Sequence, residues 1–328
     1  MGIFSRRPKL DVTAGVVVDR AWVDPELDLA DKATRAGDLD AGLALLKATE
    51  QCSDLRCLRV AALGRAAVGQ CEQLEALVAA SPEDPDLLVW LGQTKVFEAW
   101  AVRGSYTTEH VSAQVFQRFH AMLEEARLVL WDAIEAAPDD SAPWSVLQWV
   151  AIGQEVTAED KQYVFNQGLV RQPDCYAVHS GRIQVLAPKW GGSLDALIQF
   201  GRETAARAKP GRTLIAITAL VQAEIHLAAS KPAKPYELDT YFTRYKPTVL
   251  AARETWLQPE RQSEPYDIEA HGAFAYALRL YREPELAMEH VEAMQGRITT
   301  LPWAYEGDET AVFGEALARR MRLPGLLG

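Results

Sequence analysis

Hydrophobic residues recur at helical spacing along most of the chain, and polar residues fill the positions between them. Turn residues such as Gly37-Asp38 and Pro138-Asp139-Asp140 interrupt this pattern and are typical of helix boundaries. The sequence lacks the alternation of strands bounded by hairpin turns. The pattern predicts an all-α protein of about 13 to 16 helices. The clearest predicted helices cover residues 39–46, 55–68, 87–102, 111–134, 146–152, 194–206, 214–228, 241–256, 274–281 and 311–321.

Small and large apolar residues in the middle of the chain keep the register of a repeated helix pair. A small residue is followed by a large apolar one, an alanine or glycine and a proline, and the next helix then offers an aromatic residue and a leucine. This register is typical of tetratricopeptide-type (TPR) repeats, in which small residues let neighbouring helices approach closely. The residues in register are Ala126, Leu130, Ala133, Pro138, Trp144, Leu147, Phe165, Gly168 and Pro173.

These observations predict a TPR-like, right-handed superhelix of antiparallel helix pairs. We divide the chain into a flexible N-terminal tail over residues 1–20, TPR-like helical repeats over 21–187, and a C-terminal helical region over 188–328 that continues the superhelix. The repeats are irregular, because the segment from 106 to 138 holds one long helix.

The segment Pro188-Lys-Trp-Gly-Gly-Ser193 carries the most distinctive local pattern. Gly191 and Gly192 favour a tight turn, and Ser193 is suited to cap the helix that follows. Trp190 can cover such a turn as an apolar plug. Two interpretations stay open: a structural corner between helices, or a ligand loop, since free N–H groups at a helix start bind anions.

The same string, followed by a Leu/Ala-rich helix with Phe200-Gly-Arg-Glu203, resembles an uncharacterised bacterial family of TPR-like helical proteins, of the DUF4034 type. The resemblance covers residues 188–206 most specifically and departs at 196–198, where Ala-Leu-Ile stands in place of the family's usual methionine. The resemblance implies an α-helical fold and no established activity.

Charge and composition narrow the classes of function. Lys plus Arg is 34 and Asp plus Glu is 45, so the formal net charge is 34 − 45 = −11. An acidic chain is a poor match for nucleic acid, which binds basic patches. No apolar run approaches the length of a membrane span, and no secretory leader is recognised, so we expect a cytoplasmic protein. Its four cysteines are then expected to be free thiols.

Motifs for catalysis or cofactor binding are missing from the sequence, including glycine-rich nucleotide loops and H-E-x-x-H. Three pairs one helical turn apart are candidates for chemistry: His120 with Glu124, Asp267 with His271, and Cys175 with His179. We interpret them as ordinary helix-face pairs. The sequence therefore predicts no catalytic residue, no metal site and no cofactor.

The remaining candidates are aromatic and arginine residues, which carry much of the energy at binding surfaces. Nine tryptophans are present, and the segment 202–234 is locally basic. We expect a non-enzymatic protein- or peptide-binding scaffold that is monomeric or weakly dimeric. The alternative is a small-molecule-binding or catalytic α-helical protein with its pocket in the concave face near Trp190. The candidate binding residues are Trp144, Trp190, Gly191, Gly192, Ser193, Arg202, Arg207 and Arg212.

Overall fold

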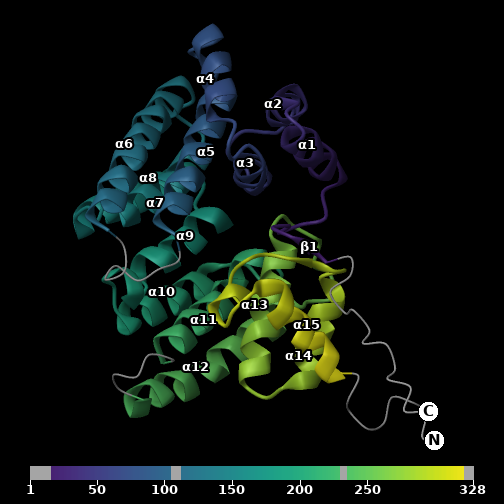
Figure 1. Cartoon of the computed structure of the whole chain (residues 1–328). Coiled ribbons are helices and arrows are strands. Elements are labelled where there is room, and N and C mark those ends of the chain that lie inside the picture. The colour runs from purple at the N-terminus through teal and green to yellow at the C-terminus, as the bar shows by residue number, and fades with distance from the viewer. Residues whose placement is uncertain (1–15, 105–111, 230–234, 321–328) are drawn as a thin grey trace, which may run out of the picture.

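The computed structural model describes residues 16–104, 112–229 and 235–320, and within these ranges the chain is almost entirely helical (Figure 1). Fifteen α-helices are present in this part of the chain, so the all-α prediction is confirmed. The helices are α1 (Pro25–Arg35), α2 (Leu39–Lys47), α3 (Asp54–Ala66), α4 (Cys71–Ala80), α5 (Pro85–Arg103), α6 (Ala113–Ala136), α7 (Ala142–Gly153), α8 (Ala158–Arg171), α9 (Tyr176–Leu186), α10 (Leu194–Arg207), α11 (Ile217–Ala229), α12 (Pro235–Trp256), α13 (Asp267–Leu280), α14 (Pro284–Ala293) and α15 (Glu309–Arg320).

Short elements precede or connect these helices. In the described ranges they are the 3₁₀ turns η2 (Pro188–Trp190), η3 (Thr213–Ala216) and η4 (Trp303–Tyr305) and the strands β1 (Val17–Val18) and β2 (Arg297–Ile298). Many helices start at a Ser, Thr or Asp whose side chain accepts a hydrogen bond from a first-turn N–H group. These caps include Asp24, Asp38, Ser53, Asp84, Ser112, Thr157 and Ser193.

Most helices pack on a neighbour in the sequence. In addition, each odd-numbered helix up to α11 packs on the next odd-numbered helix. The odd-numbered helices from α1 to α13 form one continuous series of contacts, and most even-numbered helices lie beside a sequence neighbour. Small residues permit this close packing. A Cβ atom on Gly92 of α5 would lie 2.6 Å from Leu130 Cδ2 of α6, and one on Gly168 of α8 would lie 2.9 Å from Val178 Cγ1 of α9. Gly92 and Gly168 therefore allow the helices on which they lie to approach their neighbours closely.

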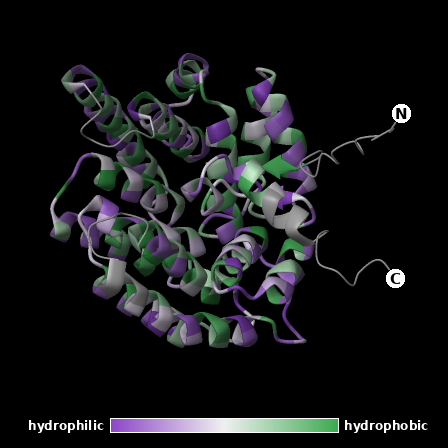
Figure 2. Cartoon of the chain, turned by 60° about the horizontal axis from the view of Figure 1, so that its bottom comes forward, coloured by the Kyte–Doolittle hydropathy of each residue, from purple (hydrophilic) through white to green (hydrophobic). Residues whose placement is uncertain are grey.

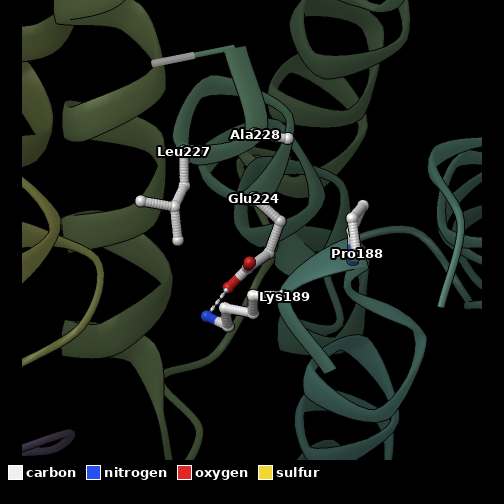
Figure 3. Close-up of a pocket in the computed structure, with 5 residues that line it drawn as sticks. All are labelled: Pro188, Lys189, Glu224, Leu227 and Ala228. Atoms are coloured by element: carbon white, nitrogen blue, oxygen red, sulfur yellow. Dashed lines mark hydrogen bonds and ion pairs between the residues drawn. The ribbon is translucent and has the colours of Figure 1, made fainter. Parts of the chain in front are cut away.

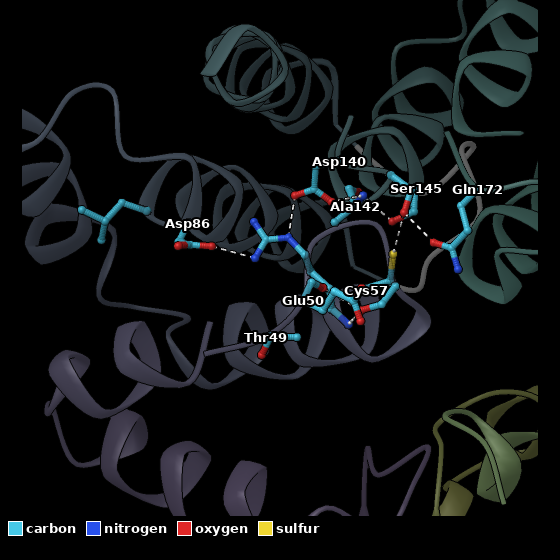
Figure 4. Close-up of polar contacts among 12 residues, drawn as sticks. Thr49, Glu50, Cys57, Asp86, Asp140, Ala142, Ser145 and Gln172 are labelled. Carbon is cyan, nitrogen blue, oxygen red and sulfur yellow. Dashed lines mark hydrogen bonds and ion pairs between the residues drawn. The ribbon is translucent and has the colours of Figure 1, made fainter. Parts of the chain in front are cut away.

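A fully buried arginine joins α3 to the starts of α5 and α7. Arg56 of α3 donates from Nη1 to Asp86 and from Nε to Asp140, each at 2.6 Å. Figure 4 shows these two carboxylates on different sides of the guanidinium group. Asp140 also accepts a hydrogen bond from the backbone N–H of Ala142 at 2.9 Å, so the same carboxylate helps to start α7.

Residues 17–21, near the start of the described chain, pack against residues 268 and 296–298. Strand β1 pairs in parallel with β2, with Val17 opposite Arg297, and Figure 1 shows β1 beside the yellow C-terminal segment. The Ala21 carbonyl accepts from the backbone N–H of Ile268 at 2.9 Å. Residues 1–15 of the predicted tail lie outside the described residues, but 16–20 belong to the folded structure, which corrects that boundary.

The apolar core connects the two halves of the chain as well. One cluster of buried side chains runs from Ala21 to Ala287 and includes Trp90, Tyr176, Tyr245 and Trp256. Figure 2 shows hydrophobic and hydrophilic residues along the same helices, as expected when each helix buries only one side. None of the helices in the described ranges is long and apolar enough to span a bilayer.

Candidate binding site

The segment between α9 and α10 forms a compact corner. After η2, Gly191 adopts a left-handed conformation with φ 85° and donates its N–H to the Pro188 carbonyl at 3.2 Å. Gly192 packs on the backbone of α9 so closely that an added Cβ would lie 2.0 Å from the Leu186 carbonyl oxygen. Ser193 then caps α10, since its Oγ accepts from the backbone N–H of Ala196 at 3.2 Å. The turn therefore requires both glycines, for different reasons.

Trp190 at this corner covers an aromatic cluster from three helices. Its ring meets the ring of Trp100 of α5 edge to face, with centroids 5.3 Å apart. Trp100 in turn contacts Phe119 of α6 at 5.1 Å and Trp149 of α7 at 6.1 Å. Such edge-to-face pairs hold aromatic rings in defined orientations. Trp190 remains half-buried, so part of the ring is left on the surface of the cluster.

A cation lies over the exposed side of this cluster. The Arg103 guanidinium is 5.0 Å from the Trp190 centroid and 5.4 Å from that of Trp100. Burial beside the indole rings lowers the pKa of Arg103 from its ordinary value, and the carboxylate of Glu155 acts in the opposite direction. Arginine keeps its charge in proteins, so this position holds a partly desolvated, permanent positive charge.

Trp190 and Arg103 form part of the wall of an open pocket of about 320 Å³. The walls combine aromatic, aliphatic and charged groups, and the charged groups are mostly positive. The lining residues are Arg103, Phe116, Phe119, Ile152, Gly153, Glu155, Lys161, Lys189, Trp190 and Gly191. Glu155 follows the end of α7 with φ 51°, a left-handed conformation that turns the chain at the edge of this pocket.

Lys189 also belongs to a polar network on the other side of the corner. Its Nζ donates to Glu224 Oε1 of α11 at 2.8 Å, as Figure 3 shows. The same oxygen accepts from Gln184 Nε2 at 2.8 Å and from the hydroxyl of Tyr305. Burial and the nearby Glu224 charge raise the pKa of Tyr305 well above its usual range. A second pocket, of about 140 Å³, opens beside Glu224.

The other predicted binding residues lie elsewhere. Trp144 is only 2% exposed and packs against Trp131, with Arg171 over its ring. It is therefore a core residue, which corrects its prediction as a residue of a binding surface. Arg202, Arg207 and Arg212 are exposed and do not line the Trp190 pocket. The Arg212 guanidinium is paired with Glu264 at 2.9 Å, because the chain before α13 folds back onto that loop.

The side chains of Cys175 and His179, and those of Asp267 and His271, contact other groups instead of each other. The His179 ring bonds through Nδ1 to the backbone carbonyl of Cys175 at 2.8 Å, while the Cys175 thiol faces Cys57 with the sulfurs 3.8 Å apart. Asp267 pairs with Arg261, and His271 contacts His290. Within the described residues, no group of three His, Cys, Asp or Glu side chains is arranged to hold a metal ion.

Sequence reasoning missed Arg103, Phe119, Lys161 and Glu224. Two of them left a signal. Arg103 follows Trp100 by three residues at the end of a helix, so both side chains share a helix face. Glu224 is the only acidic residue within the predicted apolar helix 214–228, which is a pattern expected of a buried, partnered carboxylate. Lys161 and Phe119 come from separate helices, and no spacing links them to Trp190.

No protein-family model matches the chain, and no curated protein is significantly similar to it. The class of protein is therefore defined by the fold alone, as an all-α protein of packed helix pairs with a mixed aromatic and cationic pocket.

Proposed function

We propose that the protein is a non-enzymatic helical-repeat scaffold that binds a segment of another protein, with the Trp190 pocket as its main anchoring site. The observation that carries this proposal is the composition of that pocket: an open cavity where Trp190, Phe116 and Phe119 meet Arg103 and Lys161. Tryptophan and arginine are the residue types enriched at energetic centres of protein interfaces.

The finer architecture is part of the same proposal. The series of contacts among odd-numbered helices, and the close approach at Gly92–Leu130 and Gly168–Val178, support a TPR-like right-handed superhelix. The resemblance of residues 188–206 to the DUF4034-type family agrees with this architecture, and membership of that family is part of the proposal.

The anchor is a pocket rather than a long groove. In an open superhelix, each repeat contacts only its neighbours and the concave face stays free for a partner. Here buried residues from Ala21 to Ala287 share one core, and the pocket at Trp190 is larger than the one beside Glu224. The Trp190 pocket lies outside this core, is lined by residues of α5, α6, α7, α8 and the α9–α10 corner, and is open to solvent.

A second candidate is a small-molecule-binding protein, which the Glu224 network favours. A carboxylate that is 2% exposed and receives Lys189, Gln184 and Tyr305 on a single oxygen is an unusual structural feature, and it borders a small cavity. Buried polar groups beside a pocket are typical of ligand sites.

Selection from a displayed library of random peptides tests the first proposal. We expect the full-length chain to select peptides whose affinity falls by about tenfold or more in Arg103→Gln, because the arginine charge and its stacking are lost together. Arg202→Gln is the matched control, since Arg202 is an exposed arginine outside the pocket. If Arg103→Gln binds all selected peptides normally, while a metabolite raises the melting temperature of wild type but not of Glu224→Gln, the second candidate replaces the first.

A further inference from the structure

Positive charge predominates in the Trp190 pocket although the chain as a whole is acidic. Among the described residues, Arg103, Lys161 and Lys189 line it against the single carboxylate of Glu155, whereas the whole chain has a net charge of −11. Lys189 is paired with Glu224. Within the described part of the chain, neither Arg103 nor Lys161 forms an ion pair with a carboxylate. The pocket therefore presents two cations that are available to an anionic group.

The apolar residues that line the pocket also limit which ligand can bind. Phe116, Phe119 and Trp190 come from α6 and the corner, and Arg103 is held over the Trp190 ring at 5.0 Å. A volume of about 320 Å³ is near the lower end of the range for ligand pockets, which suits one or two side chains rather than a large cofactor. A bound aromatic ring would extend the edge-to-face cluster that already joins Trp190, Trp100 and Phe119.

From this charge complementarity we propose that the Trp190 pocket recognises a peptide segment in which an acidic side chain lies next to an aromatic one. The inference rests on the proposed function and names its ligand. The carboxylate pairs with Arg103 and Lys161, and the aromatic side chain packs between Trp190, Phe116 and Phe119. Arginine binds carboxylates through two parallel N–H donors, and a partly desolvated site strengthens such bonds.

The charges of the pocket favour an anionic group over a cationic or neutral one. A lysine or arginine side chain would meet three groups of its own sign. A phosphorylated residue carries about two negative charges, so its attraction to the cations and its repulsion by Glu155 both increase. Its larger anionic group would have to share the same small cavity with the aromatic ring, whereas a carboxylate is compact. A neutral amide keeps the shape of the carboxylate but loses the charge, which makes it the natural comparison for the experiment.

The experiment measures the binding of short synthetic peptides to the full-length protein by isothermal titration calorimetry. The peptides share one flanking sequence and carry Asp-Phe, Asn-Phe, Lys-Phe, Asp-Ala or phosphoserine-Phe at the centre. We expect Asp-Phe to bind at least about tenfold tighter than Asn-Phe, Lys-Phe and Asp-Ala, since each of these lacks either the negative charge or the ring. We expect it also to bind more tightly than phosphoserine-Phe, whose anionic group is larger. Arg103→Gln and Lys161→Gln should each reduce the preference for Asp-Phe over Asn-Phe, while Arg202→Gln leaves it unchanged.

Each contrary outcome has a defined meaning. Equal affinity for Asp-Phe and Asn-Phe, or tighter binding of Lys-Phe or phosphoserine-Phe, overturns the inferred ligand while peptide binding itself stands. If none of these peptides binds but peptides selected from a random library do, the ligand assignment is wrong and the scaffold proposal survives. If no peptide of either set binds, both fail. Melting temperatures of the variants, compared with wild type, separate a loss of contact from a loss of folding.

Discussion

The two adjacent glycines of the α9–α10 corner have different physical roles, and alanine substitution separates them. Gly192→Ala places a Cβ 2.0 Å from a backbone oxygen that cannot move without shifting α9, so we expect a loss of about 3 kcal/mol or more. Gly191→Ala meets no atom within 4 Å and has only its φ of 85° to maintain, which costs about 1–2 kcal/mol. Denaturant unfolding of the two variants measures the difference. Equal losses would contradict the close approach at Gly192.

Removal of Arg56 leaves two buried carboxylates without their cationic partner. Its side chain is fully buried between Asp86 and Asp140. Arg56→Met leaves both carboxylates without a cationic partner, and we expect the free energy of unfolding to fall by about 3–5 kcal/mol. Neutralising the partners as well, in Arg56→Met with Asp86→Asn and Asp140→Asn, should restore part of that loss. A loss below about 1 kcal/mol in the single variant would show that the ion pairs are not needed for stability.

Two carboxyl groups near the start of α9 make stability depend on pH. Burial raises the pKa of Asp54 to about 6, although it accepts the backbone N–H of Tyr176, and burial raises the pKa of Glu269 to about 7. A carboxyl whose pKa is higher in the folded than in the unfolded state binds more protons when folded. Its contribution therefore falls as pH rises from about 4 towards 7.

The double variant Asp54→Asn/Glu269→Gln isolates this effect. We expect its stability relative to wild type to rise between about pH 4 and pH 7 and then to level off, because the variant has no charge to bury. Each group contributes at most about 3 kcal/mol, at 1.36 kcal/mol for each pKa unit. Taking the difference at each pH removes the contributions of the histidines. A difference that does not change with pH would mean that neither carboxyl is desolvated. The measurement is denaturant unfolding across this pH range.

At the scale of elements, the α5–α6 pair depends on one glycine facing one leucine. A Cβ on Gly92 would lie 2.6 Å from Leu130 Cδ2, and Leu130 is fully buried. Gly92→Ala should cost about 1–3 kcal/mol by overpacking. Leu130→Ala leaves a cavity and should cost about 2–5 kcal/mol. In the double variant the added methyl enters the space that the leucine vacated, so the combined loss should be smaller than the sum. Thermal and denaturant unfolding of the three variants form the cycle, and strict additivity would contradict this contact.

The described part of the molecule should unfold as one unit because residues 17–22 are joined to residues 263–298. Trp22 donates from Nε1 to Ser263 Oγ at 3.1 Å, β1 pairs with β2, and Tyr176 of α9 stacks on Tyr266 with centroids 4.7 Å apart. A fragment of residues 16–187 exposes the surfaces that these contacts bury. We expect it to lose cooperative unfolding, whereas the repeats of an open solenoid would stay folded. Circular dichroism during heating distinguishes these results, with the full chain as control.

Local features were predictable where one segment contains all the atoms involved. Helix 194–206 was expected next to its actual bounds of 194–207, since Ser193 and the apolar spacing are local signals. The helices at 25–35, 71–80, 176–186 and 284–293 are absent from the clearest predicted ranges. Those at 71–80 and 284–293 bury only one to three residues each, whereas 176–186 buries eight residues on several sides and so has no clear apolar face. Trp144 and Trp190 look alike in sequence, yet one is core and the other lines the pocket.

Helix content, most helix starts and the glycine-rich corner were determined by the sequence itself, because backbone hydrogen bonds, caps and φ preferences act over a few residues. The pocket was decided only by the tertiary structure. Arg103, Lys161 and Trp190 lie on separate segments, and only the packing of α5, α6, α7 and α8 around the corner brings them together. The same applies to the pairing of β1 with β2, since a pair such as Val17 and Arg297 leaves no periodic signal in the sequence and forms only when the core between them is assembled.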